Sequence, residues 1–524
     1  MAPSHAAHGR TAPPGLTGAA ATASGATLAA LPRRSFRLHA ERVALVCDQR
    51  RITYRRLHQR SERLAAALLA AGIEPGGRIA VLSPPRPEFV ECYAAAARLG
   101  VTVVALNTRL HDDEIAYCLE LGRPQLVFSA AALAGLLPGT IDPIVFGDGE
   151  TAYERFLAAA PDAPVEVPDP QPEQIHNVLF TSGTTGRPKG AMISQRAAAT
   201  RAMRLVQFYD LKPEDGFVGW LPMFHVGGDE SLYATLLSGG RVATFERAEA
   251  EPMLAAIERE RLTWTLLLPG VITDFLNHPR RGDHDISTFR FAIGYANMMP
   301  AVVRAFCAQV AGFWDAFGQT ETSYLLAHGW VEPGGEPSLR KTPAPLLDVR
   351  IVDEDLRELE PGAPGECVVR GPSVMSGYLG DADATAQVFA GGWLHTGDVL
   401  SRNEDGTLTY VDRRKYLIKT GGENVYPAEV EAAIASDPAV QEVCVLGVPD
   451  EYWGETIKAV VVIGEGQRLS REAIVRRCRE RLAGYKRPRY VEFLPAEAMP
   501  RSTTGKLLRH ELAALPVTDE QRVD

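Results

Sequence analysis

Two apolar runs separated by a helical pattern constrain the fold of this chain most. RIAVLSP (78–84) and VTVVALN (101–107) have the continuous apolar character of strands that are buried on both faces. Between them, FVECYAAAARLG (89–100) has the length and terminal glycine of a helix. A strand, a crossover helix and a second strand in this order predict a layered α/β sheet.

The same alternation of strand and helix patterns continues along the chain as far as about residue 340, where the pattern changes. Further strand-like runs are QLVFS, HNVLFT, FVGWLP, WTLLLP and FRFAIG, with helical stretches such as EPMLAAIERERL between them. From about residue 340 to 412 the strands are short, turns are rich in Gly and Pro, and no helix of any length is expected. After residue 412, helix and strand patterns alternate again in AEVEAAIAS, VQEVCVLGVP, IKAVVVIGE and SREAIVRRCRERLA.

These patterns predict three regions. Residues 1–31, rich in Ala, Gly, Thr and Pro, are expected to form a disordered extension, and they lack the basic-then-apolar order of a secretory signal. Residues 32–412 form a large α/β domain with a β subdomain at about 340–412, and residues 413–524 form a small α+β domain.

Composition excludes several classes of function. The net charge of −10 and pI near 5.7 argue against a nucleic-acid-binding protein. The seven cysteines are scattered and never spaced as CxxC, which is typical of thiols in a reducing cytoplasm and offers no zinc site. No apolar stretch is long enough to span a membrane. We therefore expect a cytoplasmic protein; the sequence leaves a homodimer open.

The segment TSGTTGRPKG (181–190) directly follows the predicted strand HNVLFT. Its glycines let backbone N–H groups turn toward an anion, its hydroxyls add donors, and Lys189 supplies a mobile positive charge suited to phosphate. A P-loop NTPase needs GK[ST] at a helix start, whereas here Pro188 precedes Lys189 and Gly190 follows it. A GxGxxG dinucleotide fingerprint is also absent, so we expect a mobile loop that closes over the outer phosphates of a nucleotide.

Further segments carry complementary chemistry. In FGQTE (317–321), Phe317 can stack on adenine, Thr320 can hydrogen-bond an α-phosphate, and Glu321 can hold Mg²⁺ on phosphate oxygens. In HTGD (395–398), Asp398 can accept hydrogen bonds from both ribose hydroxyls. GYANMMP (294–300), LPMFHVGG (221–228), KTGGENVYPAEVE (419–431) and RSTTGKLLR (501–509) complete the set.

Together these segments resemble the AMP-forming adenylate synthetase superfamily of acyl-CoA synthetases, peptide-synthetase adenylation domains and firefly luciferase. The resemblance extends from about Arg42 to Leu512. It implies nucleotide contacts from the loop residues Thr181, Ser182, Gly183, Thr184, Thr185, Gly186 and Lys189, from Gly294, Tyr295 and Ala296, from Asp315, Ala316, Phe317 and Gly318, and from Asp398 and Arg413. The sequence departs from the family where Phe317 replaces the more common Tyr and where Tyr295 and Asn297 alter a usual GGAP.

The same resemblance implies the catalytic groups and a moving domain. Lys506 corresponds to the lysine that bridges the attacking carboxylate and the α-phosphate, and His225 to the residue that gates the acyl pocket. Lys415 matches the hinge, and the loop containing Gly421, Gly422 and Glu423 would line the pantetheine tunnel of CoA after the small domain rotates.

The resemblance thus implies an ATP- and Mg²⁺-dependent carboxylic acid–CoA ligase, with Thr320, Glu321, His225 and Lys506 at its centre. Aryl, alicyclic and medium-chain acids all remain open as substrates. One alternative is an adenylation enzyme that loads a carrier-protein thiol, although Val226 replaces the acidic residue that amino-acid-activating relatives place after His225. A second alternative is a nucleotide-binding protein without catalysis, which the presence of Glu321 and Lys506 disfavours.

Two carboxylates, Asp229 and Glu230, follow the gating segment. The interpretation we favour places them in solvent or at the start of the helix SLYATLLSGG, and the alternative places Asp229 in a pocket for a polar acid. Gly227 and Gly228 are expected to leave room for a bulky ring, and Met298 and Met299 could form an adaptable apolar wall.

Overall fold

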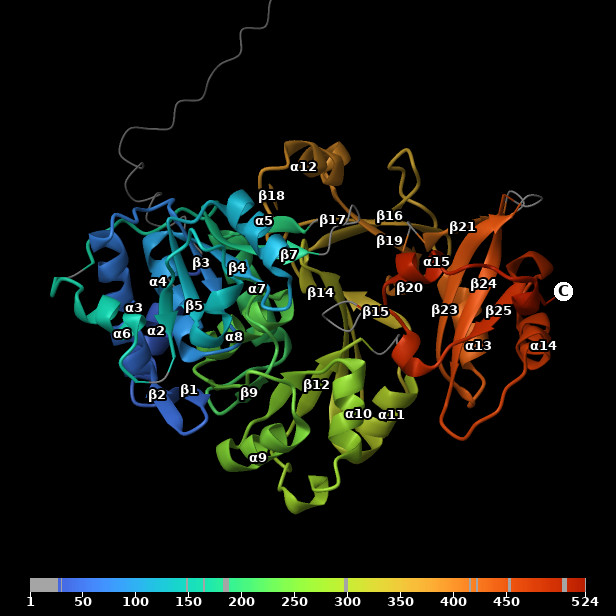
Figure 1. Cartoon of the computed structure of the whole chain (residues 1–524), viewed down its shortest axis with the longest axis horizontal. Helices are drawn as coiled ribbons and strands as arrows, with labels where there is room; N and C mark the ends of the chain where they lie inside the picture. Colours follow the sequence, from blue (N-terminus) through green and yellow to red (C-terminus); the bar gives the residue numbers. More distant parts are fainter. Residues whose placement is uncertain are drawn as a thin grey trace, which may run out of the picture.

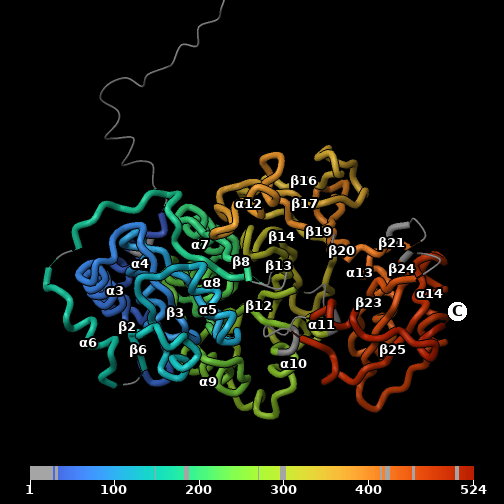
Figure 2. The backbone as a smooth tube through the Cα atoms, turned by 45° about the horizontal axis from the view of Figure 1, so that its top comes forward, coloured from blue at the N-terminus to red at the C-terminus, as the bar shows by residue number. Residues whose placement is uncertain are grey.

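The fold is described from a computed structural model of the chain. It describes residues 27–29, 31–147, 149–163, 165–181, 188–295, 300–413, 416–420, 423–450, 454–501 and 507–523. Figures 1 and 2 show a large N-terminal body and a smaller C-terminal lobe beside it. The predicted mixed α/β class with a large and a small domain is confirmed.

The larger sheet of the body has 13 strands. Its strands, in spatial order, are β16 (Asp348–Val352), β17 (Pro364–Arg370), β19 (Leu394–Arg402), β20 (Leu408–Arg413), β15 (Arg340–Pro343), β14 (Ser323–Val331), β13 (Gly312–Gln319), β12 (Phe291–Gly294), β11 (Trp264–Leu266), β9 (Gly216–Gly219), β10 (Arg241–Thr244), β1 (Val43–Cys47) and β2 (Arg50–Thr53). Five of the strands between residues 340 and 412, namely β15, β16, β17, β19 and β20, therefore extend this sheet. The absence of helices expected there is wrong, because Asp381 caps a short helix, α12 (Ala382–Val388), by accepting from Ala384 N.

The second sheet has seven strands: β18 (Gly377–Tyr378), β8 (Lys189–Ser194), β7 (Ile175–Thr181), β4 (Thr102–Leu106), β3 (Arg78–Leu82), β5 (Leu126–Ala130) and β6 (Ile144–Phe146). The βαβ unit predicted from the sequence is confirmed, since β3 and β4 are parallel and α4 (Pro87–Leu99) connects them. All five residues of β4 are buried, which explains its uninterrupted apolar sequence.

Helices cover both sheets and join them. The other helices of the body are α2 (Leu31–Leu38), α3 (Tyr54–Ala70), α5 (Asp112–Gly122), α6 (Ala152–Ala158), α7 (Gln195–Phe208), α8 (Val226–Ser238), α9 (Ala250–Glu260), α10 (Pro269–Asn277) and α11 (Pro300–Gln309). Helix α7 follows a strand of the smaller sheet and α8 follows a strand of the larger one. They pack against each other, so both sheets share one core.

The C-terminal lobe has its own sheet and core. Its strands are β21 (Ile418–Thr420), β22 (Glu423–Val425), β23 (Val440–Asp450), β24 (Gly454–Ile463) and β25 (Tyr490–Phe493), with helices α13 (Pro427–Ala435), α14 (Arg471–Arg481) and α15 (Arg509–Ala513). Asp412 in β20 connects the two parts, because its Oδ2 accepts from Ala428 N at the start of α13 at 2.8 Å.

Three residues of the segment expected to be disordered pack against the body. Residues 27–29 are buried, and Ala29 N donates to Gln195 Oε1 at 3.2 Å. The expectation of disorder throughout 1–31 is therefore wrong for these residues, because Leu28 fills apolar space beside α2 and α8. Within the described part of the chain, we find no helix with the length and apolarity needed to cross a membrane.

Candidate active site

The predicted phosphate loop connects two antiparallel strands. Thr181 pairs with Lys189 where β7 and β8 end and begin, and Thr181 Oγ1 donates to Lys189 O at 3.4 Å. Of the loop residues predicted to bind phosphate, Ser182, Gly183, Thr184, Thr185 and Gly186 lie outside the described residues. Lys189 Nζ lies 5.1 Å from the ring centroid of Tyr378, so the predicted phosphate cation has an aromatic neighbour.

FGQTE forms the tight connection between β13 and β14. A Cβ at Gly318 would lie 2.2 Å from Ser323 O, so this turn requires glycine at that position. Ser323 adopts φ of 100°, a sparsely populated conformation for a residue other than glycine. The turn places Glu321 next to β18, the strand that pairs with β8, where Tyr378 OH donates to Glu321 Oε1 at 2.9 Å.

A fully buried guanidinium holds this turn from behind. Arg201 on α7 donates through NH2 to Thr320 O at 3.1 Å and through Nε to Ser373 O at 2.8 Å. Its NH1 lies 3.2 Å from Glu230 Oε1 on α8. The backbone that carries Thr320 and Glu321 is thus fixed by α7 and, through the ion pair, by α8.

The predicted ribose residues face each other across β19 and β20. Arg413 Nε lies 2.6 Å from Asp398 Oδ1, and Asp398 is only 1% exposed. Gln319 Nε2 donates to Thr396 O at 3.2 Å, which connects the FGQTE turn to the HTGD segment. Phe317 lies 5.5 Å from the ring of Tyr410, so two aromatic side chains stand beside the proposed adenine position.

The remaining predicted nucleotide contacts lie deeper. Gly294 ends β12, where a Cβ would meet Leu267 O at 2.7 Å, and burial raises the pKa of Tyr295 to about 12. Ala316 is buried. Asp315 is also buried and its Oδ2 lies 2.6 Å from Lys341 Nζ, so a direct contact between Asp315 and nucleotide stays a prediction.

His225 caps helix α8. Its Nδ1 accepts from Gly227 N at 3.1 Å, so the imidazole occupies the position that Ser, Thr or Asp usually fills at a helix start. A swing of the ring during catalysis would break this hydrogen bond. The role of His225 as a gate therefore stays a prediction, now with a defined starting position.

The favoured interpretation of Asp229 and Glu230 is wrong. Both are 1% exposed, because α8 is enclosed between the two sheets, and the cap is supplied by His225. Asp229 Oδ1 accepts from Asn177 Nδ2 at 2.9 Å, and Glu230 Oε2 accepts from Ser323 Oγ at 2.6 Å. Burial, together with the neighbouring Glu230, raises the pKa of Asp229 to about 8, and burial also raises that of Glu230.

The glycines after His225 do not leave the space that the sequence suggested. A Cβ at Gly228 would lie 2.2 Å from Pro222 O, and one at Gly227 would lie 3.1 Å from Leu266 Cδ1. The protein's own backbone and side chains fill these positions. Met298 and Met299 lie outside the described residues.

For most of the site residues predicted in the C-terminal domain, the structure describes only the neighbouring residues. Ala296, Lys415, Gly421, Gly422 and Lys506 lie outside the described residues, as does the side chain of Glu423. Arg501 and Leu507 form an antiparallel bridge on either side of the segment that contains Lys506. Arg509, which follows this bridge, is held to the rest of the domain, because its NH2 lies 2.6 Å from Glu431 Oε1 on α13 and its NH1 donates to Val445 O.

The donor set fits Mg²⁺ bound through a nucleotide. Within the described ranges no group of three or more His, Cys, Asp or Glu could hold a metal ion alone. Glu321 offers a carboxylate with one oxygen already fixed by Tyr378. Mg²⁺ is commonly held by one or two carboxylates plus substrate phosphates, so Glu321 meets this requirement.

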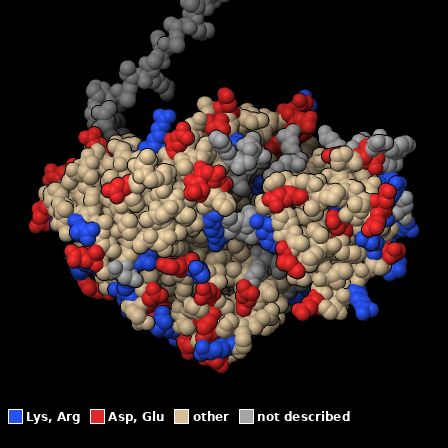
Figure 3. Space-filling view, in the orientation of Figure 1, with Lys and Arg blue, Asp and Glu red and all other residues tan. Residues whose placement is uncertain are grey.

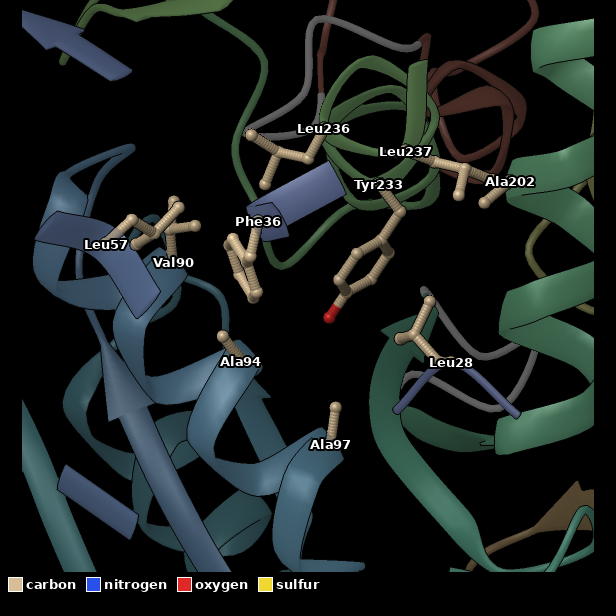
Figure 4. A pocket seen from close by; sticks show the side chains of 10 residues that line it. All are labelled: Leu28, Phe36, Leu57, Val90, Ala94, Ala97, Ala202, Tyr233, Leu236 and Leu237. Atoms are coloured by element: carbon tan, nitrogen blue, oxygen red, sulfur yellow. The ribbon is translucent and has the colours of Figure 1, made fainter. Parts of the chain in front are cut away.

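A small cavity among α2, α3, α4, α7 and α8 is lined almost entirely by apolar side chains, among them Leu28, Phe36 and Val90 (Figure 4). It offers no charge to a phosphate. Acidic and basic residues are interspersed on the face in Figure 3, and the coloured residues form no extended basic area there.

Comparisons with known proteins agree with a nucleotide site in this protein. The sequence model described as AMP-binding enzyme matches residues 32–379, and that described as AMP-binding enzyme C-terminal domain matches residues 429–506. The chain belongs to the AMP-binding enzyme family. The resemblance inferred from the motifs is thereby confirmed for both parts of the chain.

Relatives of this AMP-binding enzyme cover nearly its whole length. It is 34% identical over 492 residues to a feruloyl-CoA synthase from Amycolatopsis sp, covering 93% of this chain and 98% of the relative. It is 33% identical over 490 residues to an indoleacetate–CoA ligase from Aromatoleum aromaticum, covering 90% and 95%. The o-succinylbenzoate CoA synthetase of Bacillus subtilis in complex with its acyl-adenylate superimposes with a TM-score of 0.80 at 27% identity, covering 93% and 98%.

Sequence reasoning missed several residues at the site of this AMP-binding enzyme. Tyr378, Tyr410, Arg201 and Lys341 all contact predicted site residues, yet none stands in the motif that it supports. Their partners are distant along the chain; Arg201, for instance, lies 119 residues before Thr320. Only the pairing of strands and helices brings them together.

Proposed function

We propose that this enzyme activates a ring-bearing carboxylic acid, aryl or alicyclic, and transfers its acyl group to CoA. The enzyme is an AMP-forming acid–thiol ligase that uses ATP and CoA. Among its relatives, both the feruloyl-CoA synthase and the indoleacetate–CoA ligase are named for ring-bearing acids, which supports this choice.

One observation carries the proposal for the nucleotide site. The FGQTE turn is linked to the phosphate hairpin through Tyr378 of β18, the strand that pairs with β8, and it touches the ribose strand through Gln319 and Thr396. A nucleotide spanning these two contacts would have its ribose at Asp398 and Arg413 and its phosphates at Lys189 and Glu321. Thr320 lies in the turn between these two ends, where the α-phosphate would be.

The first half-reaction follows from this placement. A carboxylate oxygen of the acid attacks the α-phosphorus, the bond to the bridging oxygen breaks, and pyrophosphate leaves. The Lys189 ammonium stabilises charge on the leaving phosphates, and Lys506 offsets the repulsion between the carboxylate and the α-phosphate. Mg²⁺, held through Glu321, would neutralise phosphate charge when bound.

The second half-reaction needs a different arrangement of the C-terminal domain. We propose that this domain turns about Lys415, withdraws Lys506 and brings Gly421, Gly422 and Glu423 to the acyl-adenylate, while His225 leaves its cap position to open a path for the thiol. The sulfur then attacks the acyl carbon and AMP departs. No side-chain nucleophile is required.

A panel of acids in a pyrophosphate-release assay tests the substrate. Ferulate-like, indole-bearing and alicyclic propanoic acids should give kcat/KM values above those of saturated C8 and C10 acids. A preference for the straight chains would contradict the proposed acyl group. Reactions with CoA, and with a carrier protein in place of CoA, test the acceptor. Acyl-CoA should form when CoA is present, whereas transfer only to an added carrier protein would identify the alternative loading enzyme.

A further inference from the structure

Tyr378 lies between the two charged side chains proposed to handle the phosphates. Its hydroxyl donates to Glu321 Oε1 at 2.9 Å, and its ring centroid lies 5.1 Å from Lys189 Nζ. Lys189 begins a strand of the smaller sheet, and Glu321 follows a strand of the larger one. One tyrosine therefore connects the charged groups that the two sheets contribute.

The backbone around Tyr378 is fixed from several directions. β18 pairs with β8, and Leu379 N donates to Gly190 O at 2.8 Å. Met375 N donates to Glu321 O, also at 2.8 Å. Tyr378 N donates to Thr385 Oγ1 at 2.9 Å. The short segment that carries Tyr378 is thus bonded to Glu321 and to Gly190, the residue next to Lys189, which fixes where the ring can lie.

The two interactions of Tyr378 suit a spacer, a side chain that keeps the opposite charges of Lys189 and Glu321 apart. A lysine and a carboxylate that met directly would neutralise each other and leave less charge for phosphate and metal. An ammonium over an aromatic face keeps its charge and gains a modest attraction. A hydroxyl that donates to one carboxylate oxygen leaves the other oxygen available as a hard ligand. Burial and the neighbouring Glu321 raise the pKa of Tyr378, so the phenol keeps its proton as the donor.

We propose that Tyr378 is a positioning residue for adenylation: its ring holds the Lys189 ammonium and its hydroxyl orients the Glu321 carboxylate, so that both meet the phosphates of ATP without pairing with each other. This inference rests on the proposed function. It assigns the tyrosine no contact with the reacting atoms, since it acts through Lys189 and Glu321.

Two substitutions separate the two interactions. Tyr378→Phe removes the hydroxyl and keeps the ring, so the Mg²⁺ concentration for half-maximal adenylation should rise about tenfold, the scale for losing a hydrogen bond to a charged group. Tyr378→Leu removes both, so the KM for ATP should rise as well. Thioester formation from supplied acyl-adenylate and CoA should not change in either variant.

Calorimetric binding provides a readout that needs no turnover. The affinity of a non-hydrolysable ATP analogue, measured at several Mg²⁺ concentrations, should fall for Tyr378→Phe at low Mg²⁺ and recover at high Mg²⁺. Tyr54→Phe is the matched control, because its hydroxyl donates to Gly240 O at 2.6 Å elsewhere in the domain. It should lower thermal stability and leave Mg²⁺ dependence unchanged.

A double-mutant cycle tests the spacer itself. If the ring acts through Lys189, then at saturating Mg²⁺ Tyr378→Leu combined with Lys189→Met should have a KM for ATP no higher than Lys189→Met alone. Additive effects, an unaltered Mg²⁺ requirement in Tyr378→Phe, or equal losses in both half-reactions would overturn the inference. Absence of ATP turnover with any acid in the wild type would instead contradict the proposed function.

Discussion

Arg201 and Glu230 form an ion pair in which neither side chain reaches solvent, with Arg201 NH1 3.2 Å from Glu230 Oε1. The pair joins α7 to α8 directly behind the turn that carries Thr320 and Glu321. Breaking one partner of a buried pair leaves an uncompensated charge in the interior. The pair therefore couples the stability of the body to the geometry of the site.

Glu230→Gln should lower the free energy of unfolding by about 3–5 kcal/mol, the range for removing one partner of a buried ion pair. Denaturant unfolding measures this. Asp355→Asn is the control, because Asp355 and its partner Arg357 are 64% and 74% exposed. That change should cost less than about 1 kcal/mol. Similar losses in both variants would contradict the importance of burial.

Asp229 should make stability depend on pH. Burial and the neighbouring Glu230 raise its pKa from 3.8 to about 8, so between these values the folded protein holds a proton that the unfolded chain has released. The stability contributed by this proton is fully present at low pH. It falls as the pH rises toward 8, by at most about 1.4 kcal/mol per unit.

Asp229→Asn should remove this dependence, since an amide does not titrate and can still accept from Asn177. Unfolding free energies of both proteins at a series of pH values between 4 and 9 provide the measurement. The variant should gain stability relative to the wild type as the pH rises. Parallel curves would mean that Asp229 is ionised in the folded protein.

Gly227 and Gly228 form a matched pair for testing how tightly the start of α8 is packed. Gly228→Ala should destabilise the protein by at least about 1–3 kcal/mol, the usual cost of overpacking, because its methyl group would meet a backbone oxygen. Gly227→Ala would bring its methyl group within 3.1–3.4 Å of side-chain atoms of Leu266, Leu221 and His225 but of no backbone atom, and it gains helix propensity, so it should cost less than Gly228→Ala. Thermal unfolding distinguishes them, and equal tolerance would restore the idea of open space for a ring.

Asp398 should give selectivity for the ribose. If its carboxylate binds the sugar hydroxyls, the wild type should use 2′-deoxy-ATP at least about tenfold less efficiently than ATP, and Asp398→Asn should shrink this ratio. The control is Asp405→Asn, which changes an exposed carboxylate in the turn between β19 and β20. An unchanged ratio of kcat/KM values in Asp398→Asn would remove Asp398 from the ribose site.

The sequence was sufficient to predict structural features that depend on residues close together along the chain. The apolar runs 78–84 and 101–107 predicted strands joined by a crossover helix, and Pro188 and Gly190 on either side of Lys189 predicted that no helix starts there, where β8 begins instead. The burial of Asp229 could not be predicted, because two adjacent carboxylates usually lie in solvent and α8 becomes enclosed only when both sheets pack on it. The role of Tyr378 could not be predicted for a similar reason, since its partner Glu321 lies 57 residues away along the chain.

The transfer of oxygen tests the central claim most directly. If the acid attacks the α-phosphorus of ATP, one carboxylate oxygen must remain on the phosphate when the thiol takes the acyl group. With a substrate acid labelled with ¹⁸O in its carboxylate, ATP and CoA, mass spectrometry should find one ¹⁸O in the AMP and none in the pyrophosphate. Unlabelled AMP, or ¹⁸O in inorganic phosphate released together with ADP, would contradict the acyl-adenylate route and with it this account of the protein.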